Sequence, residues 1–378
     1  MACAASAAIV LAAPFIGQLQ SLLRSSLSTR AYVALLGLVV FGAIGSAVVL
    51  AFVRIRERRG MRLVLMAGAG AVGAAYTGLM STGDATIDAV ERFHFVEYGM
   101  IAVLFYRVWR RPSTTLGAAL SNVEGRAGDA SALVLPILCG FIVGTLDEWL
   151  QWFIPYRVGE MRDVLLNFTA LVCGVLFGVA LEPPPTFSLR PGPDGWSRIG
   201  VATAAAVLVF GAFVGVVHLG HELHVDGIGT FASRHSVAEL EALQRDRDAR
   251  WVAAPPLNIP RLSREDQYLD EGLWHVRERN LRWDEGQITA AWHENLILER
   301  FFAPVLDRST YASANGNRWP PEHRADAEAR GAGADAPYLS AAEPYPILMW
   351  SQPVYWLAIG SAALLCLIAG RWRLRSRR

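Results

Sequence analysis

Residues Ala132–Ile154 read ALVLPILCGFIVGTLDEWLQWFI and contain only two charged side chains, Asp147 and Glu148, both close to the carboxyl end. A helix of about 20 apolar residues crosses the ~30 Å hydrocarbon core of a bilayer. This stretch is therefore long and apolar enough to span a membrane, which excludes an ordinary soluble globular protein. The two charges inside it need a separate explanation.

Five further stretches of the 378-residue chain have the same character, with few or no charges over about 18–24 residues. They are Ala31–Val53, Leu63–Met80, Val164–Leu181, Ile199–Leu219 and Ile347–Gly370. A seventh, Phe93–Trp109, can span only if its neighbours accommodate His94 and Glu97. Hydrophobic residues make up 53% of the sequence. Gathered in this way, they predict an all-α, polytopic membrane protein with about seven transmembrane helices.

The first thirty residues are predicted to form an amphipathic leader. Pro14 interrupts the apolar run of residues 2–23, and from Ile16 to Leu27 apolar residues alternate with Gln and Arg at helical spacing. This pattern favours a helix that lies in the membrane interface, with an eighth span as the alternative. A secretory signal peptide is disfavoured because no cation precedes the apolar part.

The placement of arginine orients the spans, because cytoplasmic loops accumulate cations near the ends of helices. Sixteen arginines lie in alternate loops and in the tail: Arg54, Arg56, Arg58, Arg59, Arg62, Arg107, Arg110, Arg111, Arg126, Arg190, Arg198, Arg371, Arg373, Arg375, Arg377 and Arg378. The C-terminus is therefore expected in the cytoplasm and residues 220–346 outside the cytoplasmic (inner) membrane. Residues 220–346 contain 21 Asp and Glu against 14 Arg, so the overall charge of +1 combines −7 there with +8 elsewhere.

These features predict six parts of the chain. They are the leader or extra span (1–30), the first span with its arginine loop (31–62), a four-helix membrane domain (63–181), a cytoplasmic loop with the sixth span (182–219), an acidic extracytoplasmic domain (220–346) and the last span with a basic tail (347–378). The extracytoplasmic domain is expected to be mainly helical, because three of its segments have helical patterns: Ser236–Arg250, Gln267–Asn280 and Ala290–Leu306. Ser236 and Glu239 form a predicted capping box, and Asn315–Pro346, rich in Gly, Ala and Pro, is predicted to be a loop or tether.

Two groups of side chains in the acidic domain have competing interpretations. Its tryptophans are predicted to form a buried core, with a glycan-stacking surface as the alternative: Trp251, Trp274, Trp283, Trp292 and Trp319. No disulfide can stabilise this domain, because it has no cysteine. His218, His221 and His224 are predicted to be interfacial polar residues, since steps of three residues on a helix would separate the rings by about 60° each and disfavour a metal site.

A group of polar residues enters the membrane from the predicted outer side. Three pairs lie three or four residues apart, and so on one helical face each: His94 with Glu97, Asp147 with Gln151, and Asp163 with Asn167. Ionisable residues at membrane depth are costly and mark functional sites by default. A buried ion network that only fixes helix packing is the alternative.

The chemistry of these side chains suggests two roles. Candidate catalytic groups, able to move protons, are His94, Glu97, Asp147, Glu148 and Asp163. Candidate substrate-binding groups are Gln151, Arg157, Arg162 and Asn167, in which the guanidinium groups would hold a phosphate or carboxylate. The first set includes ligand types for a divalent cation, but the spacing matches no metalloenzyme signature, so no cofactor is assigned. The arginine-rich loops are explained by topology and predict no binding of nucleic acid.

The order of these residues resembles that of a known family. Glu91-Arg-Phe-His-Phe-Val-Glu-Tyr-Gly99 is followed by Leu146-Asp-Glu-Trp-Leu-Gln151, Pro155-Tyr-Arg157 and Arg162-Asp-Val-Leu-Leu-Asn167, with Gly174 and Gly178 beyond. This four-part order resembles the VanZ-like membrane family over about Leu63–Leu181. The family is named for a protein linked to resistance to the glycopeptide antibiotic teicoplanin. The resemblance implies a helical bundle at the cell envelope and implies no reaction.

The sequence thus predicts a VanZ-like protein of the cell envelope with an outward-facing polar site inside the membrane. We expect the site to bind an anionic lipid-linked or wall precursor, and the sequence leaves open whether it also modifies that precursor as an enzyme. One alternative is a proton-coupled transporter, which should show internal repeats with broken helices; no convincing repeat is found. The other is a non-catalytic scaffold that recruits envelope partners through residues 220–346.

Overall fold

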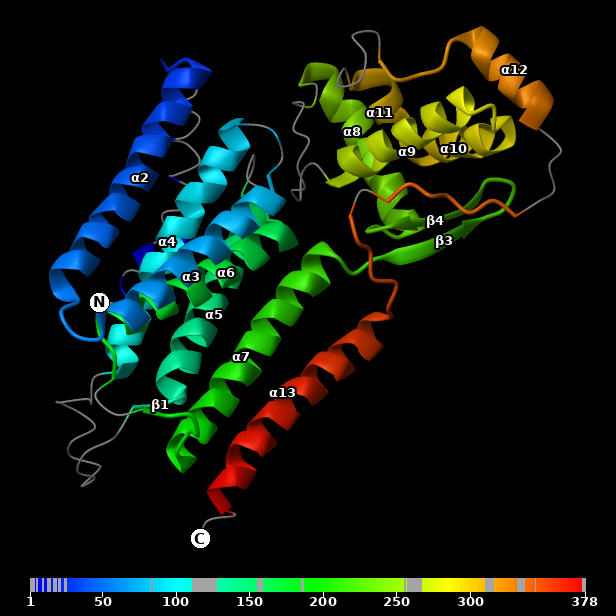
Figure 1. Cartoon of the computed structure of the whole chain (residues 1–378). Coiled ribbons are helices and arrows are strands. Elements are labelled where there is room, and N and C mark those ends of the chain that lie inside the picture. The colour runs from blue at the N-terminus through cyan, green and yellow to red at the C-terminus, as the bar shows by residue number, and fades with distance from the viewer. Residues whose placement is uncertain are drawn as a thin grey trace. The chain divides into compact units, whose positions relative to one another are not determined.

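The computed structural model describes the chain except for residues 1–3, 5, 9, 12–14, 16–18, 20–21, 24–25, 82, 84, 111–127, 155–158, 185–186, 255, 257–266, 310–315, 332–336, 344 and 376–378. The described part forms two compact units (Figure 1). The first, here called the membrane unit, comprises residues 1–151, 159–213 and 357–378. The second, the inserted unit, comprises residues 152–158 and 214–356. Helices dominate both, so the predicted all-α, polytopic fold class is confirmed.

The long helices match the apolar runs of the sequence (Figure 1). They are α2 (Thr29–Arg54), α3 (Arg59–Leu79), α4 (Ala85–Arg110), α5 (Ser131–Phe153), α6 (Met161–Leu181), α7 (Pro193–Val217) and α13 (Gln352–Arg375). All except α4 are long and apolar enough to cross a membrane, as judged by length and composition. The number of spans stays a prediction, as does the leader, because many of residues 1–28 lie outside the described part.

Small residues allow the helices around α6 to pack closely. A Cβ added at Gly174 of α6 would lie only 2.3 Å from the carbonyl oxygen of Gly99 on α4, and one at Gly178 would lie 2.8 Å from the Tyr106 ring. Glycine is needed where helix backbones approach this closely. The core around this contact contains Tyr98, Ile101, Ala102, Phe105, Tyr106, Ala170, Leu171 and Val175. Through this contact α4, which contains the polar residues, is fixed against α6.

The inserted unit begins with a β-hairpin that the sequence analysis did not predict. Strand β3 (His221–Val225) pairs antiparallel with β4 (Gly229–Ser233), and Gly227 in the turn and Gly229 at the start of β4 have φ angles of 72° and 137° that favour glycine. His221 and His224 therefore lie on a strand, and the argument from helical spacing was wrong for them. The only other strands among the described residues are the two-residue pair β1 (Gly128–Asp129) and β2 (Phe187–Ser188).

Five helices complete the described part of the inserted unit. They are α8 (Val237–Ala253), α9 (Gln267–Asp284), α10 (Ile288–Phe301), α11 (Ala303–Arg308) and α12 (Pro321–Gly331). The capping box is confirmed, because the Ser236 hydroxyl accepts from the Glu239 N–H and the Glu239 carboxylate accepts from the Ser236 N–H. The single helix predicted over Ala290–Leu306 is in fact α10 and α11, since Pro304 lacks the N–H needed to continue a helix.

The prediction of a loop or tether over Asn315–Pro346 was wrong at α12. There, ion pairs four residues apart, Arg324 with Glu328 and Asp326 with Arg330, stabilise a helix despite the weak apolar pattern. The end of the segment has no helix, and there the ring of His218 lies 3.0 Å from the Pro346 carbonyl oxygen. Beside it, the backbone of Leu348 exchanges hydrogen bonds with residues 218 and 220. The end of this segment is therefore held by hydrogen bonds.

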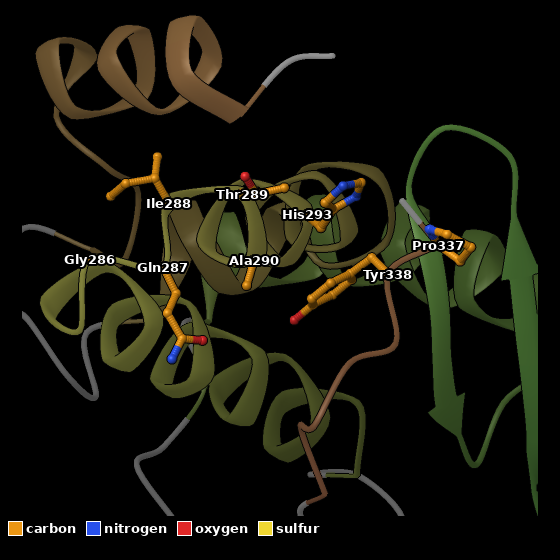
Figure 2. A pocket seen from close by; sticks show the side chains of 8 residues that line it. All are labelled: Gly286, Gln287, Ile288, Thr289, Ala290, His293, Pro337 and Tyr338. Atoms are coloured by element: carbon orange, nitrogen blue, oxygen red, sulfur yellow. The ribbon is translucent and has the colours of Figure 1, made fainter. Parts of the chain in front are cut away.

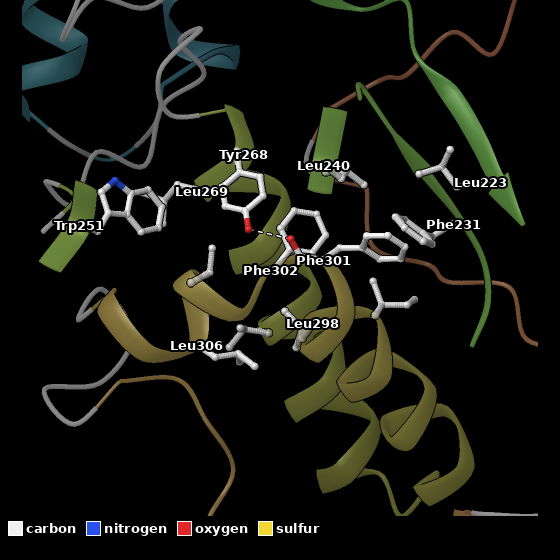
Figure 3. Packing of buried hydrophobic residues seen from close by; sticks show 13 residues of the cluster. Leu223, Phe231, Leu240, Trp251, Tyr268, Leu269, Leu298, Phe301, Phe302 and Leu306 are labelled. Atoms are coloured by element: carbon white, nitrogen blue, oxygen red, sulfur yellow. Dashed lines mark hydrogen bonds between the residues drawn. The ribbon is translucent and has the colours of Figure 1, made fainter. Parts of the chain in front are cut away.

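Buried aromatic and aliphatic residues of β3, β4, α8, α9, α10 and α11 form the core of the inserted unit (Figure 3). Within it the Tyr268 hydroxyl donates to the Phe301 carbonyl oxygen at 2.7 Å. Trp251 belongs to this core, and Trp283, Trp292 and Trp319 belong to a second cluster. The predicted aromatic core is therefore confirmed, except that Trp274 is 36% exposed, with Arg277 over its ring.

Candidate functional site

The predicted site residues come together on α4, α5 and α6 because α5 approaches both neighbours at Gly144. A Cβ added there would lie 3.2 Å from the Tyr98 ring on α4 and 3.3 Å from the Asn167 Cβ on α6. Asp147 lies three residues further along α5, nearly one helical turn, and so faces the same interior. The absence of a side chain at Gly144 thus brings polar groups of three helices into contact.

Asp147 is 3% exposed and accepts two hydrogen bonds on one carboxylate oxygen. The Tyr98 hydroxyl on α4 donates to Oδ2 at 2.9 Å, and the Gln151 amide donates to the same atom at 2.8 Å. The predicted common face of Asp147 and Gln151 is confirmed. The carboxylate therefore joins α5 to α4 inside the bundle.

Glu148 is fully buried and turns toward α6 instead. Consecutive helical residues point about 100° apart, so the neighbours Asp147 and Glu148 face different helices. The Asn167 amide donates to Glu148 Oε1 at 3.4 Å. Within the described part of the chain, the buried Asn167 Oδ1 and Thr145 Oγ1 have no hydrogen-bond partner. A bound polar group would relieve the cost of leaving such atoms unsatisfied.

His94 and Glu97 form a half-buried pair on α4. His94 Nδ1 lies 3.8 Å from Glu97 Oε2, which confirms that the two side chains share a face. The His94 ring stacks on Tyr98 with ring centroids 6.5 Å apart. Tyr98 therefore has its ring beside His94 and its hydroxyl on Asp147.

The two predicted arginines have different outcomes. Arg162 at the start of α6 pairs with Glu91 of α4 at 2.9 Å and also donates to the carbonyl oxygen of Met80. Arg157 lies outside the described residues. Asp163 stands in the first turn of α6, where the helix dipole stabilises an acidic side chain. Arg162 thus joins helices at one end of the bundle, and its side chain is 28% exposed there.

The part of the chain that the structure describes contains no group of three or more His, Cys, Asp and Glu able to hold a metal ion. The arrangement instead offers carboxylates, a hydroxyl, an imidazole and amides. Such groups can bind a polar ligand and transfer protons. We call seven of these residues the polar cluster: His94, Glu97, Tyr98, Asp147, Glu148, Gln151 and Asn167.

Sequence analysis assigned no role to Tyr98, which bonds to Asp147, to Glu91, which pairs with Arg162, or to the buried Thr145. Tyr98 follows His94 by four residues and so shares its helical face, a signal that was present in the spacing. Glu91 is likewise three residues before His94. Thr145 could not be recognised as a site residue, because its position in the sequence does not show which helix lies against its hydroxyl.

A separate hollow of about 370 Å³ lies within the inserted unit, at the first turn of α10 (Figure 2). Its lining residues are Gly286, Gln287, Ile288, Thr289, Ala290, His293, Pro337 and Tyr338. The His293 ring stacks on Tyr338 at 4.9 Å, and His293 Nδ1 lies 2.5 Å from the Ile228 carbonyl oxygen. Sequence analysis predicted none of these residues, because the hollow depends on Tyr338, which packs against α10 but lies 44 residues beyond Glu294 in the sequence.

Residues 8–182 match the family model described as VanZ/LLP1. The match begins well before residue 63, where the resemblance seen in the sequence began, so it also takes in α2 and part of the leader. Comparisons with curated proteins and with solved structures gave no match. All three helices of the polar cluster lie within the matched range. The part of the chain that holds the polar cluster is therefore VanZ-like.

Proposed function

We propose that this protein acts at the cell envelope, where its polar cluster binds an anionic lipid-linked or wall precursor that enters from the outer side of the membrane. One observation carries the proposal: Asp147 and Glu148 are buried side by side, each bonded to a different helix. Keeping two carboxylates inside a bilayer is costly, and such residues usually line substrate or ion pathways. Asn167 Oδ1 and Thr145 Oγ1 supply acceptor positions beside them.

The chemistry of the cluster supports a ligand with both hydroxyl and anionic groups. Carboxylates accept hydrogen bonds from hydroxyl groups, as Asp147 does from Tyr98. A guanidinium has five N–H donors in a planar fork, so Arg162 can keep Glu91 and still bind a phosphate oxygen. If a hydroxyl of the ligand replaced the Tyr98 hydroxyl at Asp147, the Asp147 carboxylate would act as a general base and accept the proton of that hydroxyl. This is how the same cluster could also modify its ligand.

The test is untargeted analysis of lipids and wall precursors in a deletion strain that is complemented with different variants. Wild type should restore the profile, whereas Asp147→Asn and Tyr98→Phe should fail although they reach the membrane in equal amount. Thr169→Val is the matched control, because Thr169 is partly buried on α6 and its hydroxyl donates to the Leu165 carbonyl oxygen of the same helix. Full restoration by Asp147→Asn would show that the cluster serves packing alone.

The same strains separate the two alternative functions. A proton-coupled transporter would give a defect in Asp147→Asn that changes with external pH, while the precursor profile stays normal. A scaffold would tolerate Asp147→Asn and lose function when residues 220–346 are deleted. Residues 220–346 lie within the inserted unit, which has its own core, so this deletion removes residues from one compact unit only.

A further inference from the structure

Three arginines converge on one glutamate at the opposite ends of α4 and α6 from the polar cluster. Arg107 and Arg110 of α4 lie 3.0 and 2.7 Å from the two carboxylate oxygens of Glu182, which follows α6. Arg54 at the end of α2 lies 3.7 Å from the same carboxylate. The Tyr106 hydroxyl donates to the Glu182 carbonyl oxygen at 2.8 Å and fixes its backbone. We call these three arginines with Glu182 the arginine cluster.

The arginine cluster has more positive charge than its carboxylate can neutralise. Arginine stays protonated in proteins, so three guanidinium groups and one carboxylate leave a net charge of +2. The negative ends of the α2, α4 and α6 dipoles offset part of that charge. They do not occupy the remaining N–H donors, and the arginine side chains are 58%, 38% and 29% exposed for Arg54, Arg107 and Arg110. An anion can therefore reach them.

The surroundings of these arginines are apolar and exposed. Phe52 and Val53, the two residues before Arg54, are 62% and 63% exposed, and Val108, which lies between the other two arginines in the sequence, is 53% exposed. Candidate spans such as α2 end near the surface of the bilayer, where cations meet the headgroups. Cations beside exposed apolar side chains fit a phosphate attached to acyl chains, whereas free phosphate would gain nothing from the apolar part.

We propose that Arg54, Arg107 and Arg110 bind the phosphate of an anionic phospholipid of the surrounding membrane. The headgroup would lie over the ends of α2, α4 and α6 and link these three helices in addition to Glu182. The site is independent of the polar cluster, because Arg110 is twelve residues beyond Tyr98 on α4, about 18 Å along the helix.

The test uses the full-length protein in mild detergent, with bound lipids counted by native mass spectrometry as phosphatidylglycerol or phosphatidylcholine is added. Wild type should retain phosphatidylglycerol about tenfold more tightly than phosphatidylcholine, as expected for a few cations near a headgroup. The double variant Arg107→Gln/Arg110→Gln should lose this preference. The control Arg56→Gln/Arg190→Gln removes the same charge from exposed positions and should keep it.

Glu182→Gln provides a second test that does not depend on removing arginines. It takes away the competing carboxylate, so phosphatidylglycerol should bind at least as tightly as to wild type. Inorganic phosphate added in excess should not displace the lipid. The proposal is overturned if wild type binds both lipids equally, if the control pair loses the preference as fully as the test pair, or if Glu182→Gln weakens retention of phosphatidylglycerol.

Discussion

Glu294 of α10 is a fully buried carboxylate with three partners in the inserted unit. His275 Nδ1 lies 2.6 Å from one of its oxygens, and the hydroxyls of Tyr338 and Ser340 donate to the other at 2.5 Å each. Burial opposes ionisation of Glu294, but the charge of His275 and these hydrogen bonds together lower its pKa below the usual 4.5. The ionised carboxylate thereby joins α9 and α10 to the segment that leads to α13.

Glu294→Gln should destabilise the inserted unit by about 3 kcal/mol near pH 7, because it removes a buried carboxylate that bonds to three side chains and leaves those buried groups without their acceptor. A carboxyl whose pKa is lowered on folding stabilises above its unfolded pKa, and this contribution is lost as pH falls through the folded pKa. Wild type should therefore lose stability below about pH 4.5, and the variant should lose less over that range. Urea unfolding of the detergent-solubilised protein, followed by tryptophan fluorescence, measures both effects.

Glu328→Gln is the matched control for this experiment, because Glu328 pairs with Arg324 on the exposed surface of α12. An exposed pair four residues apart contributes about 0.3–0.5 kcal/mol. If Glu294→Gln changes stability no more than this control does, the carboxylate has no structural role.

Individual residues of the candidate site differ in how far they could be predicted. The pair of Asp147 and Gln151 was predictable, because both lie on one helix and spacing alone sets their common face. Contacts between helices were not predictable, because the spacing of residues along one helix does not give its rotation relative to another helix. The Tyr98 hydroxyl on Asp147 is 49 residues away in sequence, and the partners of Glu294 are 19 to 46 residues away.

Among the elements, the long helices were predictable and the shorter ones less so. A run of about 20 apolar residues has only one way to cross a bilayer. The hairpin of β3 and β4 was missed because its strands are short and its turn depends on Gly227 and Gly229. Helix α12 was missed because ion pairs on its surface stabilise it in place of a strong apolar face. Close packing of helices, as at Gly174, was also beyond prediction.

Gly174→Ala should destabilise the membrane unit, although alanine usually favours a helix by up to about 1 kcal/mol over glycine. The added Cβ would lie 2.3 Å from the Gly99 carbonyl oxygen, and backbone at that position cannot move without separating α4 from α6. We expect the melting temperature in detergent to fall by roughly 5 °C. Gly68→Ala on α3 is the control, because no atom would lie within 4 Å of its Cβ, and it should be neutral or stabilising. Equal effects of both changes would contradict close packing at Gly174.

The whole molecule combines a VanZ-like membrane part with an inserted unit that has its own core. The inserted unit is continuous in sequence with α7 and α13, and a backbone bridge between Leu219 and Leu348 joins the chain just after α7 to the chain just before α13. The Arg234 guanidinium donates to the Val216 carbonyl oxygen and so caps the end of α7. These contacts make the start and end of the unit ordered, which composition alone did not suggest.

The orientation of the chain can be tested with two positions on either side of α7. Arg190 precedes this helix and Asp226 follows it, both are exposed, and a single crossing must place them on opposite sides of the membrane. The arginine distribution predicts residue 190 inside and the acidic inserted unit outside. In a background without the four native cysteines, Asp226→Cys should react with a membrane-impermeant maleimide on intact cells. Arg190→Cys should react only after the membrane is permeabilised. Labelling in the reverse order would invert the predicted orientation, and equal labelling of both would mean that α7 does not cross the membrane.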